Sequence, residues 1–220
     1  MLGAGNLDEV VAAVKPRKPT RRERAAATRE RIVRAATEEF AEAGYVGARM
    51  ADIAAGAGAA VQTVYFIFHT KPELLAACYD HAVLGPEQLP PPQQVFWGEM
   101  VSARSGRAAL AAFAGGNTEI LSRVAAIDEV ARAAPHEPEA AQVVAYHEQL
   151  RRQGYADVVA ILAERWGLRR GVERETGADL LLLFGSSATY LTLRRYGWED
   201  VPLVVELRDG GPDVNYLMRS

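Results

Sequence analysis

The stretch 56-GAGAAVQTVYFIFHTKPELL-75 decides how the rest of the chain is read. It opens with Gly56-Ala57-Gly58, continues with three aromatic residues in four positions, and ends in a charged turn. A dinucleotide-binding loop would need a preceding strand and a third glycine at the start of the helix. Here the preceding residues have helical spacing and Val61 holds the third position, so no dinucleotide site is expected.

The pattern around Gly58 instead predicts two short helices joined by a tight turn. Before the turn, apolar residues recur at helical spacing at Met50, Ile53, Ala54 and Ala57. After it, a second helix from about Ala60 has Val64 and Phe68 on one face. Two helices joined by a turn containing glycine form a helix-turn-helix. We therefore predict this motif, with its second helix as the recognition helix.

The flanking segments supply a helix on each side of the motif. Capping boxes are expected at Thr20-Arg21-Arg22-Glu23 and at Thr70-Lys71-Pro72-Glu73. Between them, Ile32, Ala36, Phe40 and Ala43 recur at helical spacing, and Gly44 stands where a helix commonly ends. The first helix is thus expected to start near Thr20 or Thr28, and another to follow Thr70.

The face of the second short helix opposite Val64 and Phe68 carries side chains that suit DNA. In a helix-turn-helix this face enters the major groove. Gln62 has both a donor and an acceptor for a base edge such as adenine. Thr63 and Tyr65 offer hydroxyls to phosphates, and Lys71 lies at a helix N-terminus that favours an anion. Tyr65 and Phe66 could alternatively pack against their own domain.

The segments 28-TRERIVRAATEEFAEAGY-45 and 50-MADIAAGAGAAVQTVYFIFHTKPELL-75 together resemble the DNA-binding domain of the TetR (tetracycline-repressor-like) family of bacterial transcription regulators. The resemblance implies an all-α fold, with an N-terminal helix-turn-helix domain and a C-terminal helical ligand-binding and dimerisation domain. It also implies a set of DNA-contacting residues, with His69 as a further phosphate contact or a solvated turn residue. These residues are Arg49, Val61, Gln62, Thr63, Tyr65, Phe66, His69 and Lys71. Where the family has Ser or Thr helix caps, this chain has Ala48 and Ala60.

The expected organisation has three parts: an arm over 1–19, the DNA-binding domain over 20–72, and a helical domain over 73–220. Nine Lys or Arg and two acids fall between Lys15 and Arg34, whereas 14 basic and 18 acidic residues follow from His81 onward. The basic stretch either follows DNA phosphates or is a solvated face. Helices are expected near 93–103, 106–115, 117–134, 138–167 and 176–196, with a further one within 199–208.

The helical domain should supply a dimer surface and a ligand site. Residues 180–184 are apolar all round their helix, which predicts burial on every side, with a second copy or the chain's own core as the cover. The dimer contacts expected there are Leu181, Phe184, Ala188 and Leu191. The expected ligand contacts, with Glu119 and Asp128 as further polar candidates, are Trp97, Met100, Phe113, Tyr146 and His147.

The sequence contains no motif typical of a metal site or of an enzyme. His147-Glu148 has no second histidine four residues after the first, so we expect no metal and no cofactor. No nucleophile elbow or supported Cys–His pair indicates an enzyme. A single cysteine, Cys78, fits a reducing compartment, and neither a signal peptide nor a membrane span is expected, so the prediction is cytoplasmic.

The leading hypothesis is therefore a homodimeric repressor that a small apolar molecule releases from a palindromic DNA operator. A helical enzyme and a protein-interaction adaptor without DNA binding remain as alternatives. Neither the operator sequence nor the effector follows from the residues, and activation instead of repression stays open.

Overall fold

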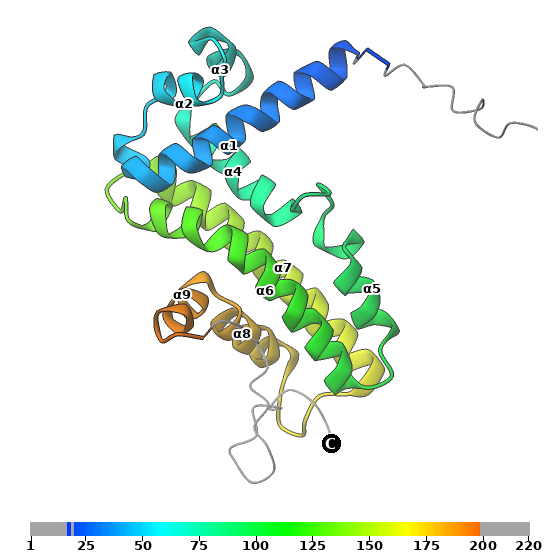
Figure 1. Cartoon of the computed structure of the whole chain (residues 1–220). Helices are drawn as coiled ribbons and strands as arrows, with labels where there is room; N and C mark the ends of the chain where they lie inside the picture. Colours follow the sequence, from blue (N-terminus) through cyan, green and yellow to red (C-terminus); the bar gives the residue numbers. More distant parts are fainter. Residues whose placement is uncertain (1–16, 19, 199–220) are drawn as a thin grey trace, which may run out of the picture.

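The computed structural model describes residues 17, 18 and 20–198, and every regular element in that part of the chain is helical. In Figure 1 the first helices of the chain pack together at one end, and the long helices over 106–132 and 138–166 run side by side through the rest. We call α1–α3 the head and α5–α9 the body, with α4 between them. The expected all-α fold is confirmed.

The head begins with a capped helix, as predicted. Thr20 Oγ1 accepts from the Glu23 amide at 3.2 Å, and Glu23 accepts from the Thr20 amide at 2.6 Å. Gly44 interrupts the helix with φ 69° and ψ 171°, a positive φ that favours glycine, and one further turn follows it. The helices of this part are α1 Arg21–Gly47, α2 Met50–Gly56, α3 Val61–Ile67 and α4 Lys71–Leu84.

The second capping box forms only in part. Thr70 Oγ1 accepts from the Glu73 amide at 3.3 Å, which satisfies one free donor in the first turn of α4. The Glu73 carboxylate, however, accepts from the His69 amide at 3.1 Å instead of from Thr70. The carboxylate therefore fixes the residue before the cap, which ties the end of α3 to the start of α4.

The body differs from its prediction at two places. The expected break at Gly115-Gly116 is absent, because Gly116 lies against the Phe96 ring and the helix continues through both glycines. The expected helix 176–196 is divided at Gly185, where Ser186 Oγ caps a new helix through the Thr189 amide at 3.1 Å. The elements are the 3-10 turn η1 Pro91–Gln93, then α5 Val95–Ser102, α6 Gly106–Arg132, α7 Pro138–Trp166, α8 Arg174–Phe184 and α9 Ser187–Arg195. The helix expected within 199–208 lies outside the described residues.

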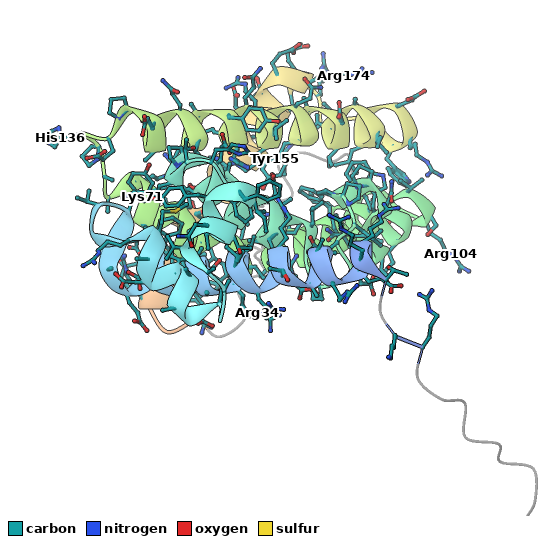
Figure 2. The ribbon with its side chains drawn as sticks, turned by 90° about the horizontal axis from the view of Figure 1, so that it is seen from above. Arg34, Lys71, Arg104, His136, Tyr155 and Arg174 are labelled. Atoms are coloured by element: carbon teal, nitrogen blue, oxygen red, sulfur yellow. The ribbon has the colours of Figure 1, made fainter. Side chains whose placement is uncertain are left out.

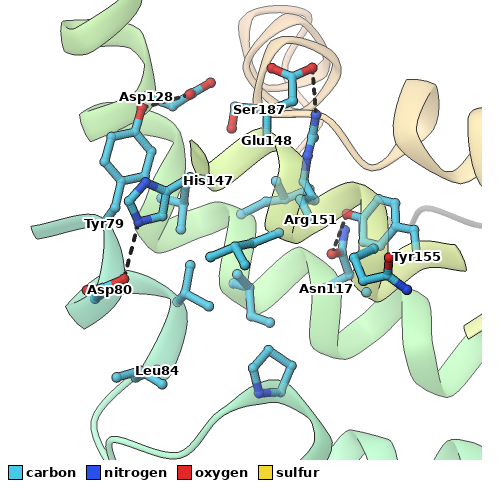
Figure 3. Close-up of a pocket in the computed structure, with 18 of the residues that line it drawn as sticks. Tyr79, Asp80, Leu84, Asn117, Asp128, His147, Glu148, Arg151, Tyr155 and Ser187 are labelled. Atoms are coloured by element: carbon cyan, nitrogen blue, oxygen red, sulfur yellow. Dashed lines mark hydrogen bonds and ion pairs between the residues drawn. The ribbon is translucent and has the colours of Figure 1, made fainter. Parts of the chain in front are cut away.

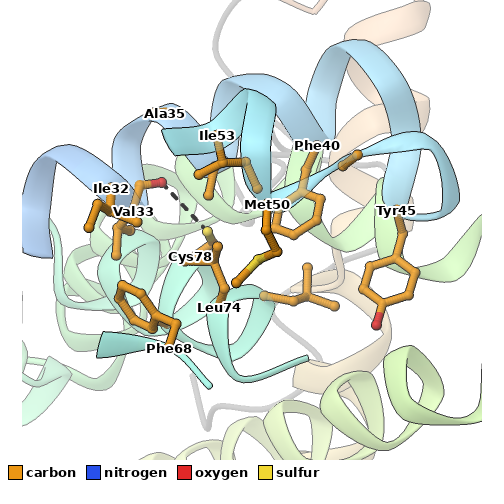
Figure 4. Close-up of a cluster of buried hydrophobic side chains, with 14 of the residues drawn as sticks. Ile32, Val33, Ala35, Phe40, Tyr45, Met50, Ile53, Phe68, Leu74 and Cys78 are labelled. Atoms are coloured by element: carbon orange, nitrogen blue, oxygen red, sulfur yellow. Dashed lines mark hydrogen bonds between the residues drawn. The ribbon is translucent and has the colours of Figure 1, made fainter. Parts of the chain in front are cut away.

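Two apolar cores hold these elements. The first joins α1–α4 and includes Ile127, Ala131 and Ala140 from the near ends of α6 and α7, so head and body share one core. Figure 4 shows its centre, with side chains of α1, α2 and α4 facing one another and Cys78 among them. The second core lies between α5, α6, α7 and α8.

No single helix of the described residues is both long and apolar enough to cross a membrane. The pair α2 and α3 passes on length and composition when taken together, but it is bent by 107°.

Candidate DNA-binding surface and ligand cavity

The α2–α3 unit has the geometry of a helix-turn-helix. The chain turns by 107° between the two helices, within the range typical of this motif. Gly58 makes the turn with φ 59°, a conformation that favours glycine. Arg31 on α1 donates from Nε to the Ala57 carbonyl at 3.3 Å, so the first helix of the head holds the turn in place.

The two faces of α3 separate as the spacing predicted. Val64 and Phe68 are buried in the first core, with exposed fractions of 0% and 3%. On the outer side Phe66 is 82% exposed and Tyr65 is 49% exposed, and Gln62 is also exposed. Val61 and Thr63 are half-buried, and Val61 packs partly against the first core. The outer side of α3 therefore offers an amide, a phenol and an unpartnered aromatic ring to a groove.

Arg49 and His69 flank this face and are both exposed. Arg49 precedes α2 and pairs with Asp52 at 3.3 Å, and His69 follows α3 and pairs with Glu73 at 3.4 Å. Exposed pairs of this kind are weak, so a phosphate can compete with the carboxylate for either side chain.

Lys71 has a different environment from the other predicted DNA contacts. Its ammonium donates to the carbonyl of Tyr45 at 2.8 Å, and it lies 3.3 Å from the Ala48 carbonyl and 3.4 Å from that of Val46. It also lies 4.6 Å from the centre of the Tyr45 ring. An ammonium has three N–H donors, and three carbonyls at the end of α1 take them here. The structure thus gives Lys71 a role in joining α4 to α1, which the sequence did not predict.

A cavity of about 470 Å³ lies in the body, bounded by residues of α4, α5, α6, α7 and the start of α9 (Figure 3). Its apolar wall includes Leu84, Ile120 and Val124. Of the five predicted ligand contacts, Trp97, Phe113 and His147 line it. The other two, Met100 and Tyr146, do not line it: Met100 is fully buried in the second core and Tyr146 is 57% exposed, and their contact with a ligand stays a prediction.

One side of the cavity carries a chain of charged groups. The Tyr79 hydroxyl donates to Asp128 at 2.8 Å, and Arg132 bridges Asp128 at 2.9 Å and Glu148 at 2.7 Å. Burial, followed by the charge of Asp128, raises the pKa of Tyr79, so this phenol stays a donor. Partial burial opposes the charge of Arg132, but the hydrogen bonds to Glu148 and Asp128 outweigh it and raise the arginine pKa.

His147 connects the same side to α4. Its Nδ1 lies 2.9 Å from the Val143 carbonyl, and its Nε2 lies 3.2 Å from the Asp80 carboxylate. The second of these contacts joins α7 to the second half of α4 at the cavity. The ring also stacks on Tyr79, with 4.5 Å between centres.

The opposite side contains a buried polar pair that the sequence analysis missed. The Tyr155 hydroxyl lies 2.6 Å from Asn117 Oδ1 and 2.9 Å from the Gly185 carbonyl. Burial raises the pKa of Tyr155 to about 12. Asn117 is 5% exposed and lines the cavity, where its Nδ2 has no hydrogen-bond partner. A polar residue within the apolar stripe of α6 was the available signal.

The predicted dimer contacts separate into two groups. Leu181 is 2% exposed and packs in the second core of its own chain, and its contact with a second copy stays a prediction. Phe184 is 43% exposed and Ala188 is also exposed, while Leu191 is half-buried. Leu183, beside them, is 60% exposed. An apolar strip therefore lies open along α8 and α9.

Comparison with known sequences supports the assignment of a helix-turn-helix to the head. Residues 32–78 match the profile of the bacterial regulatory proteins of the tetR family. This range covers most of α1, the whole α2–α3 unit and the first half of α4. No curated protein matches the sequence.

Solved structures share the fold of this protein over most of the chain. A transcriptional regulator from Pseudomonas aeruginosa PAO1 is 20% identical, with a TM-score of 0.62 over 84% of this chain and 86% of that one. NalD, the secondary repressor of the MexAB-OprM multidrug efflux pump in Pseudomonas aeruginosa, is 20% identical, with a TM-score of 0.59 over 80% and 90%. A TetR transcriptional regulator from Chloroflexus aurantiacus J-10-FL is 20% identical, with a TM-score of 0.58 over 82% and 90%. The head therefore matches the tetR family of bacterial regulatory proteins over residues 32–78, and the chain shares the helical fold of solved transcription regulators that include TetR-family members.

Proposed function

We propose that the protein is a repressor that binds a palindromic operator as a homodimer and is released by a small apolar molecule in the body. The observation that carries this proposal is the outer side of α3. Gln62, Tyr65 and Phe66 are exposed there, although two of them are aromatic and the neighbouring Val64 is fully buried. A groove of duplex DNA would cover such a face and read its amide.

The apolar strip on α8 and α9 supports a homodimer. Leu183 and Phe184 expose large apolar side chains next to each other, which a second copy of the same strip would cover. A two-fold dimer presents two α3 helices to one duplex, and successive major grooves then require a palindromic site.

Helix α4 provides the connection between ligand and DNA in this proposal. Its first residue, Lys71, is bonded to the end of α1 in the head, whereas Tyr79, Asp80 and Leu84 in its second half line the cavity. A ligand that displaces the second half of α4 would therefore change the position of the head. The ligand must bind more tightly to the form that cannot engage DNA, and DNA must weaken the ligand by the same factor.

The test begins with selection of bound duplexes from random DNA, followed by fluorescence anisotropy on the selected site. Gln62→Ala should relax base preference at one or two positions, with a loss of about 1–3 kcal/mol on the best site. Tyr65→Phe should weaken all duplexes, because a hydroxyl to phosphate carries no sequence information.

Gln149→Ala is the matched control, since Gln149 is an exposed glutamine on α7. It should leave both affinity and preference unchanged. If Gln62→Ala and Tyr65→Phe behave like this control, the outer side of α3 is not the DNA-binding surface.

A further inference from the structure

We propose that the effector is an uncharged, mainly apolar molecule with one oxygen group that hydrogen-bonds to the Asn117 amide. This inference rests on the proposed function, since it specifies the ligand of the same cavity. Its starting point is the Asn117 Nδ2 atom, which is buried in the cavity wall without a partner. A buried amide donor left without a partner costs about 1–3 kcal/mol, so such groups are rare in folded proteins.

The hydroxyl group of Tyr155 does not supply the missing partner of Asn117 Nδ2. Tyr155 has one proton and two acceptors in range, Asn117 Oδ1 and the Gly185 carbonyl. The Gly185 carbonyl also accepts a hydrogen bond from Arg151 Nη1 at 3.1 Å. When Tyr155 donates to Asn117, every group around it is satisfied except Asn117 Nδ2.

Rotating the Asn117 amide by half a turn changes which amide atom lacks a hydrogen-bond partner, but one atom still lacks one. Nδ2 would then donate to the Tyr155 oxygen, and Tyr155 would donate to Gly185. The Asn117 oxygen would become the atom without a partner. In either orientation one amide atom of Asn117 is left over, and a group brought by a ligand can complete it. A carbonyl oxygen serves the first orientation, and a hydroxyl serves both.

The surroundings of Asn117 exclude a charged group at this position. The nearby cavity wall is aromatic and aliphatic, with Phe113 edge-on to Tyr155 at 5.5 Å and Phe96 6.4 Å from Phe113. A cation placed here would lose its hydration beside Arg151, which donates to the Gly185 carbonyl at 3.1 Å, and an anion would have to compete for that guanidinium with Glu148 at 3.7 Å. The charged residues Asp128, Arg132 and Glu148 already pair with one another on the other side of the cavity.

The size and chemistry of the cavity further define the class of ligand that would fit. A volume of about 470 Å³ suits a compact small molecule of two or three rings or a branched chain. Such a molecule would pack its apolar body against Trp97, Ile120 and Val124 and direct a ketone, ester, amide or alcohol oxygen to Asn117.

Three probes of nearly equal shape test this inference: benzophenone, diphenylmethanol and diphenylmethane. They carry a carbonyl, a hydroxyl and a methylene group between the same two rings. Calorimetric titration of the full chain should show the two oxygen-containing probes binding about tenfold more tightly than diphenylmethane. Simple partition into an apolar space gives the reverse order, because diphenylmethane is the least water-soluble of the three.

The preference should disappear in Asn117→Leu, which keeps the side-chain volume close to that of asparagine. Gln153→Leu is the control, because Gln153 also lines the cavity but is exposed and donates to Asp157 at 2.9 Å. That variant should keep the preference. The melting temperature of ligand-free Asn117→Leu should be equal to or above that of the original protein, since an unsatisfied donor has been removed and Tyr155 retains Gly185.

The possible results separate the two proposals. If all three probes bind equally, or diphenylmethane binds best, Asn117 does not select the ligand, and the cavity remains a site for apolar effectors. If none binds to a folded protein that still binds its selected DNA, the Asn117 inference is rejected, while the DNA binding in the proposed function stands. A lower melting temperature for Asn117→Leu, with the preference intact, would make Asn117 a structural residue only.

Discussion

Single residues in this protein have roles that depend on which atoms lie opposite them. Lys71 is the clearest case. Its position at the N-terminus of α4 suits a phosphate contact. Its ammonium, however, faces three carbonyls at the end of α1 and the ring of Tyr45. Those carbonyls have lost their helical partners, so a cation there stabilises the helix end as well.

Lys71→Met should therefore lower the free energy of unfolding by about 1–2 kcal/mol, because it keeps the side-chain stem but removes the ammonium. Urea denaturation measures this change. Arg34→Met is the control: the Arg34–Glu30 pair is exposed, and its loss should cost less than about 0.5 kcal/mol. Equal stability of the two variants, together with weaker DNA binding only for Lys71→Met, would assign Lys71 to phosphate contact alone.

Cys78 illustrates burial of an ionisable group. It is 2% exposed in the first core, and burial raises the pKa of its thiol to about 12, against 9.0 for a free thiol. The folded state thus holds the proton over a range where the unfolded chain releases it. Stability is unaffected by this group below pH 9 and falls as the pH rises from 9 to 12.

We expect the free energy of unfolding to decrease above pH 9 and the Cys78→Ala variant to decrease less steeply. Denaturant titrations at a series of pH values measure both slopes. Burial also raises the pKa values of Tyr45 and Tyr155 to about 12, so a residual slope from these groups should begin nearer pH 10. Identical slopes for the variant and the original protein would contradict a thiol that stays protonated in the fold.

At the scale of elements, close packing decides where helices continue and where they end. Helix α6 runs through Gly115 and Gly116, and the two residues have opposite surroundings. A Cβ atom on Gly116 would lie 2.0 Å from the Phe96 ring, whereas a Cβ on Gly115 would meet nothing within 4 Å. Gly116 is thus the reason that α5 can approach α6 and form one wall of the cavity.

These neighbouring glycines provide a matched pair of variants. Gly115→Ala should stabilise the protein by about 0.5–1 kcal/mol, because alanine lowers the entropy cost of an exposed helical position. Gly116→Ala should destabilise it by roughly 2 kcal/mol or more, because α5 must move away from α6. Thermal and urea unfolding measure both changes. Stabilisation by both variants would contradict the observed α5–α6 packing.

Close packing also explains why the chain turns between α8 and α9. A Cβ on Gly185 would lie 2.6 Å from the Tyr155 hydroxyl and 2.8 Å from the Leu181 carbonyl, so the chain at this point touches α7 closely. Ser186 then caps α9 and allows the chain to change direction. The helix pair that carries the apolar strip is therefore held by the same tyrosine that faces Asn117.

At the scale of the whole molecule, head and body are mechanically joined. They share the first core, and α4 contacts both α1 and the two long helices. In Figure 2, which looks from above, Lys71 lies beside the head and Tyr155 points inward from the long helix α7. A ligand-induced shift of α4 would reach the DNA-binding face without any change in the recognition helix itself.

The proposed homodimer gives a prediction at this scale. Leu183→Glu should shift the protein from dimer to monomer in sedimentation equilibrium, because a charge would be buried in the covered strip on α8. Val95→Glu is the control, since Val95 is 73% exposed on α5, away from the strip. It should leave the association state unchanged. A dimer that persists in Leu183→Glu would place the interface elsewhere.

The sequence by itself determined the head and the fold class, because local rules act there. The Thr20 cap, the Gly58 turn and the alternation of Val64 and Phe68 with exposed Tyr65 and Phe66 follow from helical periodicity and from the backbone freedom of glycine. The contact residues named on α3 remain a prediction; Gln62, Tyr65 and Phe66 are exposed as it requires, whereas Val61 and Thr63 are half-buried.

The tertiary structure alone decided the properties that depend on distant neighbours. Helical period could not show that Gly116 meets Phe96, that Leu181 faces inward while Leu183 faces outward, or that Met100 is enclosed in the second core. Nor could it place Tyr155 against Asn117, 38 residues earlier, or Lys71 against the end of α1. Burial and hydrogen bonding are pairwise properties of residues far apart in the chain, and a one-dimensional pattern records only one member of each pair.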